Sequence, residues 1–302
     1  MNIIIAGGTG LVGSELVRTL SRLDDTKIYI LTRSESNEVN PYLQYVNWDD
    51  MKELLPINPH IIINLAGATL NKKWTDEYKQ EILNSRLHTI DALYQYVDSL
   101  SVKPHTYINA SAVGYYPTSQ HVKYDEGDVF QSHDFLSGVV SRIEYESDKF
   151  SQFDTRVVKT RFGIILDREQ GALSEMIKPY KFGVGGKIGS GKQWMSWIHI
   201  DDAINALLFL IFNEDVCGPV NVVAPHAERQ ENFSKTLASV MDKPNMAIVP
   251  KPIIKAILGE RSQLILEGQS VQPSVLLDKG FKYKYPMLEQ ALNHLIHIKD
   301  YS

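Results

Sequence analysis

Residues 7–13 form a glycine-rich turn suited to binding a phosphate group. They read Gly-Gly-Thr-Gly-Leu-Val-Gly, directly after a predicted strand over Asn2–Ala6 and directly before a predicted helix over Leu11–Leu23. Gly7 permits the tight turn, Gly10 lets the backbone approach a pyrophosphate, and Gly13 lets the helix pack closely on the strand. The N–H groups that begin the helix, from Leu11 and Val12 onward, attract an anion. This placement predicts a dinucleotide site, and the alternative is a plain tight turn.

The end of the second strand selects between two dinucleotides. The predicted strand Lys27–Thr32 ends at Thr32, and Arg33 lies 20 residues after Gly13. A carboxylate at this place usually holds the ribose hydroxyls of NAD, whereas a basic residue favours the extra phosphate of NADP. We therefore expect NADP(H), with Thr32 and Arg33 among its contacts. The alternative is a solvated arginine at a strand end.

Two further strand ends add candidate cofactor contacts. Asp49 follows the predicted third strand, Leu43–Trp48, where it could meet the adenine or remain an exposed loop acid. Leu65, Ala66 and Gly67 close the predicted fourth strand over residues 60–64, and small residues there would let a cofactor pass over the strand end. A glycine that merely terminates the strand is the alternative.

The elements that must position these residues alternate between short β-branched runs and longer helical patterns. This rhythm is typical of parallel strands joined by crossover helices. We expect an α/β fold, a Rossmann-type doubly wound parallel sheet with a smaller, interleaved C-terminal substrate lobe. The predicted domains are residues 1–165 for NADP binding and 166–302 for the lobe, with about 194–213 returning to the Rossmann domain. The later elements we expect are strands at 106–110 and 156–161, helices at 75–97, 135–150, 200–212, 231–240 and 288–298, and a loop at 183–191.

Composition excludes several classes of function. The 302 residues carry a net charge of −5, which gives no overall attraction to nucleic acid or to an anionic membrane. Cys217 is the single cysteine, so no internal disulfide can form. The longest apolar stretch, 203–212, is about half the length that spans a bilayer. A signal peptide fits the first residues poorly, so we expect a cytoplasmic protein that acts on a small-molecule substrate.

Nine segments along the chain form a distinctive set. They are the glycine turn, Asn-Leu-Ala-Gly at 64–67, Ser-Ala-Val-Gly-Tyr-Tyr at 111–116, Lys-Lys-Trp-Thr at 72–75, Asn-Ser-Arg at 84–86, Gly-Gly-Lys-Ile-Gly-Ser-Gly-Lys-Gln at 185–193, Ser-Trp-Ile-His-Ile-Asp-Asp at 196–202, Glu-Gly-Gln-Ser-Val-Gln-Pro at 267–273 and Lys-Gly-Phe-Lys-Tyr at 279–283. Together they resemble the extended short-chain dehydrogenases/reductases, and more narrowly the atypical branch called epimerase family proteins. The resemblance implies a Rossmann sheet, a small substrate lobe and NADP(H). It also implies that Glu81 and Arg86 lie near the cofactor, Arg86 neutralising phosphate and Glu81 binding a ribose hydroxyl or orienting the arginine. A surface helix pair is the alternative.

The sequence departs from the family pattern at the catalytic residues. Active members of the superfamily pair a Ser or Thr with a Tyr and a Lys four residues later, and these groups hold the reacting oxygen and exchange its proton. Ser111 fits the first role, but residues 135–136 and 139–140 are Phe-Leu and Val-Val where the Tyr and the Lys belong. The pair Tyr145…Lys149 begins 34 residues after Ser111, too far along the helix, and is expected to face solvent.

Other residues near Ser111 could contribute to a site. Tyr115 is the leading candidate for proton donor, although an unassisted tyrosine needs a neighbouring cation at neutral pH. Tyr116, Gln193 and Trp197 are assigned to a substrate pocket, with the loop 183–191 as a lid or a plain connection. His199 is expected to be a hydrogen-bonded structural residue. No metal site is expected, because His294 and His297, three apart near the chain end, fit a solvated helix face.

Two functions from different classes follow. One is an NADP-dependent oxidoreductase or nucleoside-diphosphate-sugar epimerase-like enzyme, with a non-standard proton donor and an unknown small polar substrate. The other is a non-catalytic NADP(H) redox sensor or scaffold, which the missing Tyr and Lys favour. An interaction module with a vestigial glycine turn is a third reading. The residues specify neither a substrate nor an oligomeric state.

Overall fold

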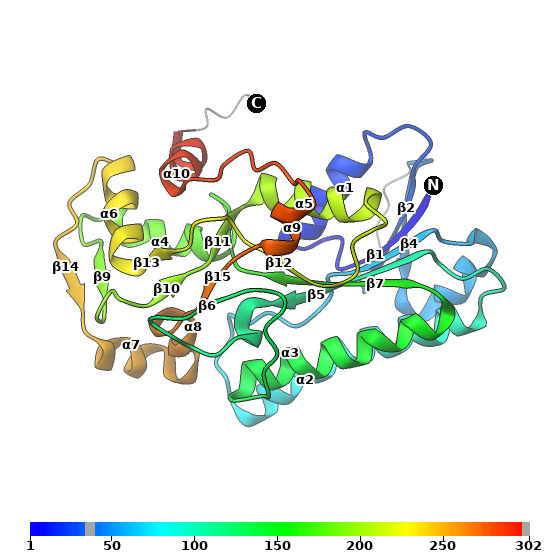
Figure 1. Ribbon diagram of the computed structural model, residues 1–302, viewed down its shortest axis with the longest axis horizontal. Helices are drawn as coiled ribbons and strands as arrows, with labels where there is room; N and C mark the ends of the chain where they lie inside the picture. Colours follow the sequence, from blue (N-terminus) through cyan, green and yellow to red (C-terminus); the bar gives the residue numbers. More distant parts are fainter. Residues whose placement is uncertain (34–39, 298–302) are drawn as a thin grey trace.

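The computed structural model describes residues 1–33 and 40–297, and a sheet of seven parallel strands lies at its centre (Figure 1). The strand order is β12–β7–β5–β4–β1–β2–β3, so the chain fills one half of the sheet before it crosses to the other. The strands are β1 (Asn2–Ala6), β2 (Lys27–Thr32), β3 (Leu43–Asn47), β4 (Ile61–Asn64), β5 (Thr106–Ala112), β7 (Arg156–Phe162) and β12 (Gly218–Val222). The order reverses between β1 and β4, and ligands of such sheets bind beyond the carboxyl ends of the strands at that point. The predicted Rossmann-type fold is confirmed.

Buried β-branched side chains account for the sheet. Ile3 of β1 pairs with Ile28 of β2 on one side and with Ile61 of β4 on the other. All three are buried, as are the neighbouring isoleucines of β1 and β4. Continuous apolar strands of this kind require cover on both faces, which is what the helices provide.

Two layers of helices cover the sheet (Figure 1). Helices α2 (Asp76–Ser99) and α3 (Phe135–Asp148) run along one face with the 3₁₀ segment η1 (Trp48–Ile57), while α1 (Leu11–Leu20) and α5 (Ile200–Phe212) cover the other. Helix α2 begins where the Thr75 side chain accepts from the Tyr78 N–H. Helix α3 begins with reciprocal bonds between Asp134 and Ser137. These caps satisfy N–H groups that a helix start leaves without partners.

The C-terminal lobe extends beyond one end of the sheet (Figure 1). Its helices are α4 (Gly171–Lys181), α6 (Gln230–Val240), α7 (Lys251–Leu258), α8 (Gln263–Leu266), α9 (Ser274–Asp278) and α10 (Leu288–His297). Its short strands are β8 (Ile164–Leu166), β9 (Gly186–Ile188), β10 (Trp194–Met195), β11 (Trp197–His199), β13 (Glu228–Arg229), β14 (Ala247–Val249) and β15 (Ser270–Val271), which pairs with β6 (Lys123–Tyr124). Single 3₁₀ turns complete the chain at η2 (Val113–Tyr115), η3 (Lys149–Phe153) and η4 (Gly259–Ser262).

The chain returns from the lobe to the sheet over a longer segment than predicted. Helix α5 packs against α1, inside the expected return of residues 194–213. Strand β12 then pairs with β7 as the edge strand of the central sheet, which extends the return to Val222. The predicted boundary between residues 165 and 166 stays a prediction.

The glycine-rich segment 183–191 is not the wholly irregular loop that the sequence predicted. Strand β9 lies within it and pairs in parallel with β14. A Cβ on Gly186 would lie 1.9 Å from the Ala247 carbonyl oxygen, so the missing side chain is what allows this pairing. The other predicted elements are present with ends that differ by at most three residues, and the expected end of the last helix at Ile298 lies outside the described residues. Among the described helices, none combines the length and apolar character required to cross a bilayer.

Candidate functional site

The glycine turn joins β1 to α1 in a conformation that only glycine tolerates at two positions. Gly7 has φ +79°, and a Cβ there would lie 2.7 Å from the Leu65 carbonyl carbon. A Cβ on Gly13 would lie 2.1 Å from the Gly7 carbonyl oxygen. At Gly10 the added atom would meet only that oxygen, at 3.5 Å, so the outer side of the turn at Gly10 is open.

Helix α1 begins at this turn without a side-chain cap. Gly10 is its N-cap, no side chain bonds its first N–H groups, and no acidic residue lies in its first turn. Leu11 and Val12, both half-buried, supply these first helical positions. An uncapped N-terminus behind a glycine turn fits a pyrophosphate, because the N–H groups and the helix dipole both favour negative charge.

The next strand ends lie at the same edge of the sheet. Thr32 is the half-buried last residue of β2, and exposed Arg33 follows it. Asp49 is exposed in η1, beside the end of β3, where its N–H donates to the Asn47 side chain. Because β1, β2 and β3 are adjacent and parallel, these residues lie on the same side as the glycine turn.

Arg86 lies beneath the end of β4, against the backbone of Gly67. A Cβ on Gly67 would be 2.8 Å from the Arg86 guanidinium carbon. Arg86 donates from Nη1 to the Ile82 carbonyl oxygen, and burial lowers its pKa. No carboxylate within residues 1–33 and 40–297 pairs with it, and Glu81, exposed on α2, does not orient it. A half-buried cation without a counter-charge, at a strand end, fits an anionic cofactor.

A cavity of about 310 Å³ opens over the carboxyl ends of β4, β5 and β7. Ser111 lines it together with Leu65, Ala66, Gly67 and Arg86. The structure therefore brings together Ser111 and the predicted cofactor contacts of the fourth strand. Its other walls come from η2, α3, β8, the segment before β11 and α8, with Gly114, Asp134, Ile164, Trp194, Ser196, Gln263, Glu267 and Gln269 among them.

Helix α3 presents apolar side chains to this cavity. Leu136, Val139 and Val140 line it, at the places where the superfamily carries its Tyr and Lys. Tyr145 is 63% exposed and Lys149 pairs with Glu146, so the displaced Tyr…Lys pair faces solvent. No Tyr, Lys or His is among the described residues that line the cavity.

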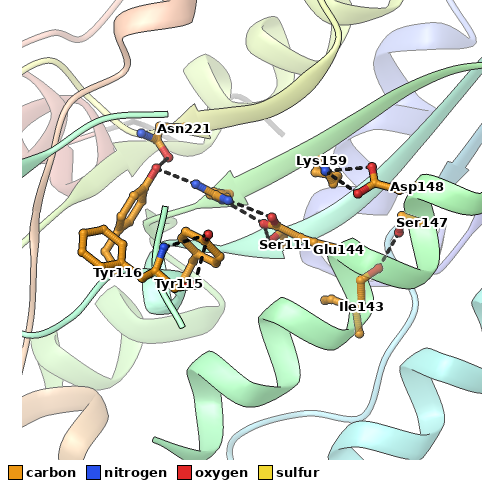
Figure 2. Close-up of polar contacts among 11 residues, drawn as sticks. Ser111, Tyr115, Tyr116, Ile143, Glu144, Ser147, Asp148, Lys159 and Asn221 are labelled. Carbon is orange, nitrogen blue, oxygen red and sulfur yellow. Dashed lines mark hydrogen bonds and ion pairs between the residues drawn. The ribbon is translucent and has the colours of Figure 1, made fainter. Parts of the chain in front are cut away.

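Ser111 is bonded to a buried ion pair that the sequence did not reveal. Its Oγ donates to Glu144 Oε1 at 2.5 Å. Arg161 reaches the same carboxylate twice, from Nε to Oε1 and from Nη2 to Oε2, each at 2.8 Å. Burial works to lower the pKa of Arg161, but its bonds to Glu144 raise that pKa above its ordinary value. Figure 2 shows Ser111 of β5 beside Glu144 of α3, and Arg161 reaches the same carboxylate from β7.

The two tyrosines after Ser111 lie outside the cavity walls. The Tyr115 hydroxyl accepts from the Phe130 N–H at 3.2 Å and donates to the Phe130 carbonyl oxygen at 3.5 Å, so its expected role as proton donor stays a prediction. A cation does lie beside this tyrosine, since the Arg161 guanidinium carbon lies 3.6 Å from the centre of the Tyr115 ring. Tyr116 is fully buried and bonds Arg161 and Asn221 (Figure 2), so it does not contact a substrate as predicted. Burial raises the pKa of Tyr116 to about 12.

Of the two predicted substrate contacts from the lobe, Gln193 lines a hollow and Trp197 does not. Gln193 lines a second, polar hollow of about 480 Å³, with Ser119, Ser190 and Lys251, which shares Thr118, Glu267 and Gly268 with the first cavity. Trp197 is fully buried and donates to the His226 carbonyl oxygen, so its assignment to the pocket was wrong. Trp194 and Ser196 line the cavity instead. Alternation along 194–197 indicates that these two share a face, because residues two apart do so in an extended chain, but it does not show that this face meets the cavity.

His199, Asp201 and His294 form a group close enough to approach a metal ion. Their atoms already bond one another and their neighbours. His199 Nδ1 accepts from the Asp201 N–H, its Nε2 lies 3.0 Å from His294 Nδ1, and Asp201 Oδ2 accepts from Lys284 Nζ at 2.9 Å. Burial lowers the pKa of His199 to about 4. His199 is thus the structural histidine expected, whereas His294 packs on it rather than forming a solvated face.

Comparison with known proteins points to one family. A model described as the NAD dependent epimerase/dehydratase family matches residues 3–135, and a domain of unknown function, DUF1731, matches residues 249–295. An epimerase family protein of Staphylococcus aureus (strain MRSA252) is 46% identical over 295 residues, covering 97% of this chain and 98% of the relative. One from Staphylococcus epidermidis is 45% identical, with the same coverage.

Solved structures agree with the sequence relatives. The crystal structure of the human epimerase family protein SDR39U1 (isoform 2) with NADPH has a TM-score of 0.86 and 30% identity, covering 98% of this chain and 99% of that one. A nucleoside-diphosphate sugar epimerase from Corynebacterium glutamicum has a TM-score of 0.79 and 25% identity, covering 98% of this chain and 58% of that one. UDP-glucose 4-epimerase from Thermotoga maritima, at 14% identity over 98% of this chain and 97% of that one and a TM-score of 0.76, shares the fold.

Proposed function

The chain belongs to the NAD dependent epimerase/dehydratase family, and on that premise we propose that it binds NADP(H) and oxidises or reduces a small polar substrate beside Ser111. The observation that carries the proposal is the meeting of two features at one edge of the sheet. The uncapped glycine turn fits a pyrophosphate, and it adjoins the cavity at Leu65, which lies against Gly7 and lines the cavity together with Ser111. NADP(H) supplies or accepts a hydride when it is bound.

Residues of the first four strands would hold the cofactor. The N–H groups at Leu11 and Val12 would receive the pyrophosphate, and Arg86 would add positive charge near the Gly67 backbone. Arg33, at the end of β2, supports NADP over NAD because a guanidinium binds a phosphate with two parallel bonds. The NADPH in the structure of the human relative supports the same choice.

The cavity sets the kind of substrate. A volume of about 310 Å³ suits a small molecule, and the adjoining polar hollow can take an extended polar group such as part of a nucleotide-linked sugar. Ser111 would bond the reacting oxygen. We assign no proton transfer to Tyr115, because it is not among the residues that line the cavity and its hydroxyl donates to the Phe130 carbonyl oxygen.

Turnover of NADP⁺ tests the proposal. The purified full chain is mixed with NADP⁺ and a panel of small alcohols and nucleoside-diphosphate sugars, and the gain of NADPH absorbance is followed. We expect at least one compound to be oxidised, with the rate falling at least tenfold in Ser111→Ala, because the substrate hydroxyl would lose the oxygen that orients it. Ser147→Ala is the matched control, because this buried serine is not among the residues that line the cavity and donates to the Ile143 carbonyl oxygen (Figure 2). Turnover by no compound, in protein that binds NADPH, would reject the enzyme.

The second candidate is a non-catalytic NADP(H) sensor. It is favoured by Leu136, Val139 and Val140, which leave the described cavity walls without the proton-exchanging pair of active relatives. A sensor binds a partner with an affinity that differs between NADP⁺ and NADPH. Pull-downs with the full chain loaded with each form would show this, and equal recovery of every partner would reject the sensor.

A further inference from the structure

The hydroxyl proton of Ser111 is already committed inside the protein. Ser111 has one O–H, and it donates to Glu144 Oε1 at 2.5 Å. Arg161 bonds both oxygens of that carboxylate, at 2.8 Å each. A carboxylate held this way by a guanidinium is ionised, and an ionised carboxylate can only accept hydrogen bonds. The direction of the Ser111–Glu144 bond is therefore fixed, with Ser111 as the donor.

The surrounding residues keep Glu144 paired with Arg161, so the direction of the Ser111–Glu144 hydrogen bond cannot reverse. The side chains of Arg161 and Glu144 are only 4% and 8% exposed. Arg161 also donates from Nη1 to the Tyr116 hydroxyl at 2.8 Å, and its guanidinium carbon lies 3.6 Å from the centre of the Tyr115 ring. Rotating Glu144 away would leave a buried cation without its partner, which is strongly destabilising.

What remains available to a ligand at Ser111 is a lone pair. The neighbouring walls of the cavity on α3 are apolar, from Leu136, Val139 and Val140, and offer neither a donor nor an acceptor from their side chains. A ligand oxygen that bonds Ser111 Oγ must therefore bring its own proton. A carbonyl oxygen cannot do this, whereas a hydroxyl or an amine can.

We propose that Ser111 acts as a hydrogen-bond acceptor toward the ligand, fixed in that polarity by Glu144 and Arg161, so that the cavity prefers an alcohol to the matching carbonyl compound. Glu144 and Arg161 are positioning residues in this arrangement. The inference rests on the proposed function in one respect, since it takes the cavity beside Ser111 as the place where the substrate binds. It goes further by naming the chemical class, a hydroxyl or amine donor, that is recognised there.

A matched pair of probes tests the polarity directly. Cyclohexanol and cyclohexanone differ in little but the donor, and both fit a cavity of about 310 Å³. Each is titrated into the cofactor-free, ¹⁵N-labelled full chain, and dissociation constants are taken from amide shifts around residues 110–114. We expect cyclohexanol to bind about five- to tenfold more tightly, the factor that one net hydrogen bond gives. The preference should fall below twofold in Ser111→Ala and persist in Ser147→Ala.

Three results would overturn the proposal. They are a ketone that binds as tightly as the alcohol, a preference that survives in Ser111→Ala, and shifts around residues 110–114 with neither probe. The charge of Glu144 is checked separately by the infrared difference between wild type and Glu144→Gln at neutral pH. A carboxylate band is expected, and the carbonyl band of a protonated acid would also contradict the proposed polarity of Ser111.

A parallel titration with NADPH separates this inference from the proposed function. Ser111→Ala removes one hydroxyl in the substrate cavity and leaves the glycine turn intact, so NADPH affinity should stay within about threefold. If Ser111→Ala loses the alcohol preference but still binds NADPH, the result supports the role of Ser111 without bearing on cofactor binding. Failure of the wild-type protein to bind NADPH would instead refute the proposed function.

Discussion

Arg33 stands exposed after β2, the strand beside β1, where an additional phosphate on the adenosine ribose would reach it. Arg33→Ser should weaken NADPH binding about ten- to a hundredfold, because a hydrogen bond to a charged group contributes about 1.5–3 kcal/mol. NADH lacks that phosphate, so its affinity should stay within about twofold. Isothermal titration calorimetry of both nucleotides measures the difference. Arg18→Ser is the control, since Arg18 pairs with Glu15 on the outer side of α1, and equal losses in the two variants would show that only net charge matters.

Glu144 is the buried partner of Arg161, so its loss would leave a buried cation without a counter-charge. Glu144→Gln removes the charge that neutralises buried Arg161, and breaking a buried pair on one side costs about 3–5 kcal/mol. Chemical denaturation should show a loss of that order in the free energy of unfolding. Glu15→Gln breaks an exposed pair with Arg18 and should cost less than about 1 kcal/mol. A loss as small for Glu144 would mean that the carboxylate and Arg161 are not paired in solution.

At the scale of residues, the sequence identifies groups whose roles are local. The turn glycines, Ser111, Gly67 and Arg86 all lie where their spacing placed them. The Ser111–Glu144–Arg161 set was not visible, because its members are up to 50 positions apart and nothing in the pattern shows that an arginine in a strand is buried. Trp197 was misassigned for a related reason. Trp194 and Trp197 are three positions apart, so an extended chain places them on opposite faces, and the sequence does not show which of the two faces meets the cavity.

Strand β1, the glycine turn and helix α1 form one continuous unit. Substitutions of its glycines should distinguish an effect on NADPH binding from an effect on folding. Gly13→Ala places a Cβ 2.1 Å from the Gly7 carbonyl oxygen, so it should destabilise the protein and abolish NADPH binding together. Gly10→Ala meets that oxygen at an ordinary 3.5 Å, so the fold should survive while the methyl group obstructs the pyrophosphate. Thermal denaturation and NADPH titration of both variants measure the two effects.

Helix α3 provides the control for those substitutions. A Cβ on Gly138 would meet nothing within 4 Å, so Gly138→Ala should stabilise the protein by about 0.5–1 kcal/mol through helix propensity. NADPH binding should not change. If Gly10→Ala binds NADPH as the wild type does, the pyrophosphate does not lie against this turn.

The elements that the sequence predicted best are those that local physics specifies. The isoleucine runs of β1 and β4 are buried on both faces, and the capped helices α2 and α3 begin at or within one residue of their predicted starts. Strand β9 could not be predicted in the same way, because its partner β14 lies about 60 residues later and the pairing depends on a contact between two distant backbones. The return of β12 to the sheet is non-local for the same reason.

At the scale of the whole molecule, His199 connects α5 of the Rossmann layer to α10 at the end of the lobe. It is fully buried, its Nε2 lies 3.0 Å from His294, and the Tyr285 ring stacks on it at 4.0 Å. Asp201 and Lys284 also face the pair, and the Asp202 carboxylate accepts from the Lys284 N–H. Burial lowers the pKa of His199 to about 4, and Asp201 partly opposes this.

This depressed pKa makes stability depend on pH in one direction. Below the unfolded pKa of about 6.5 the unfolded chain takes up a proton that the folded chain refuses, so the stabilisation present above pH 6.5 is lost as pH falls toward about 4. The loss should approach 3 kcal/mol, since each unit of pKa is worth about 1.4 kcal/mol. Denaturant midpoints across this range should fall less in His199→Gln than in wild type. His105→Gln, at an exposed histidine, is the control variant, and an unchanged slope in His199→Gln would contradict the buried neutral imidazole.

The central claim is that backbone N–H groups at residues 10–13 receive the pyrophosphate of NADP(H), with Arg33 reading its extra phosphate. Calorimetric titration of the purified full chain with NADPH and with NADH tests this most directly. We predict one site per chain, with NADPH bound at least tenfold more tightly than NADH. Absence of heat and of any thermal stabilisation with both nucleotides would contradict the account, because a ligand that binds only the folded state must stabilise it.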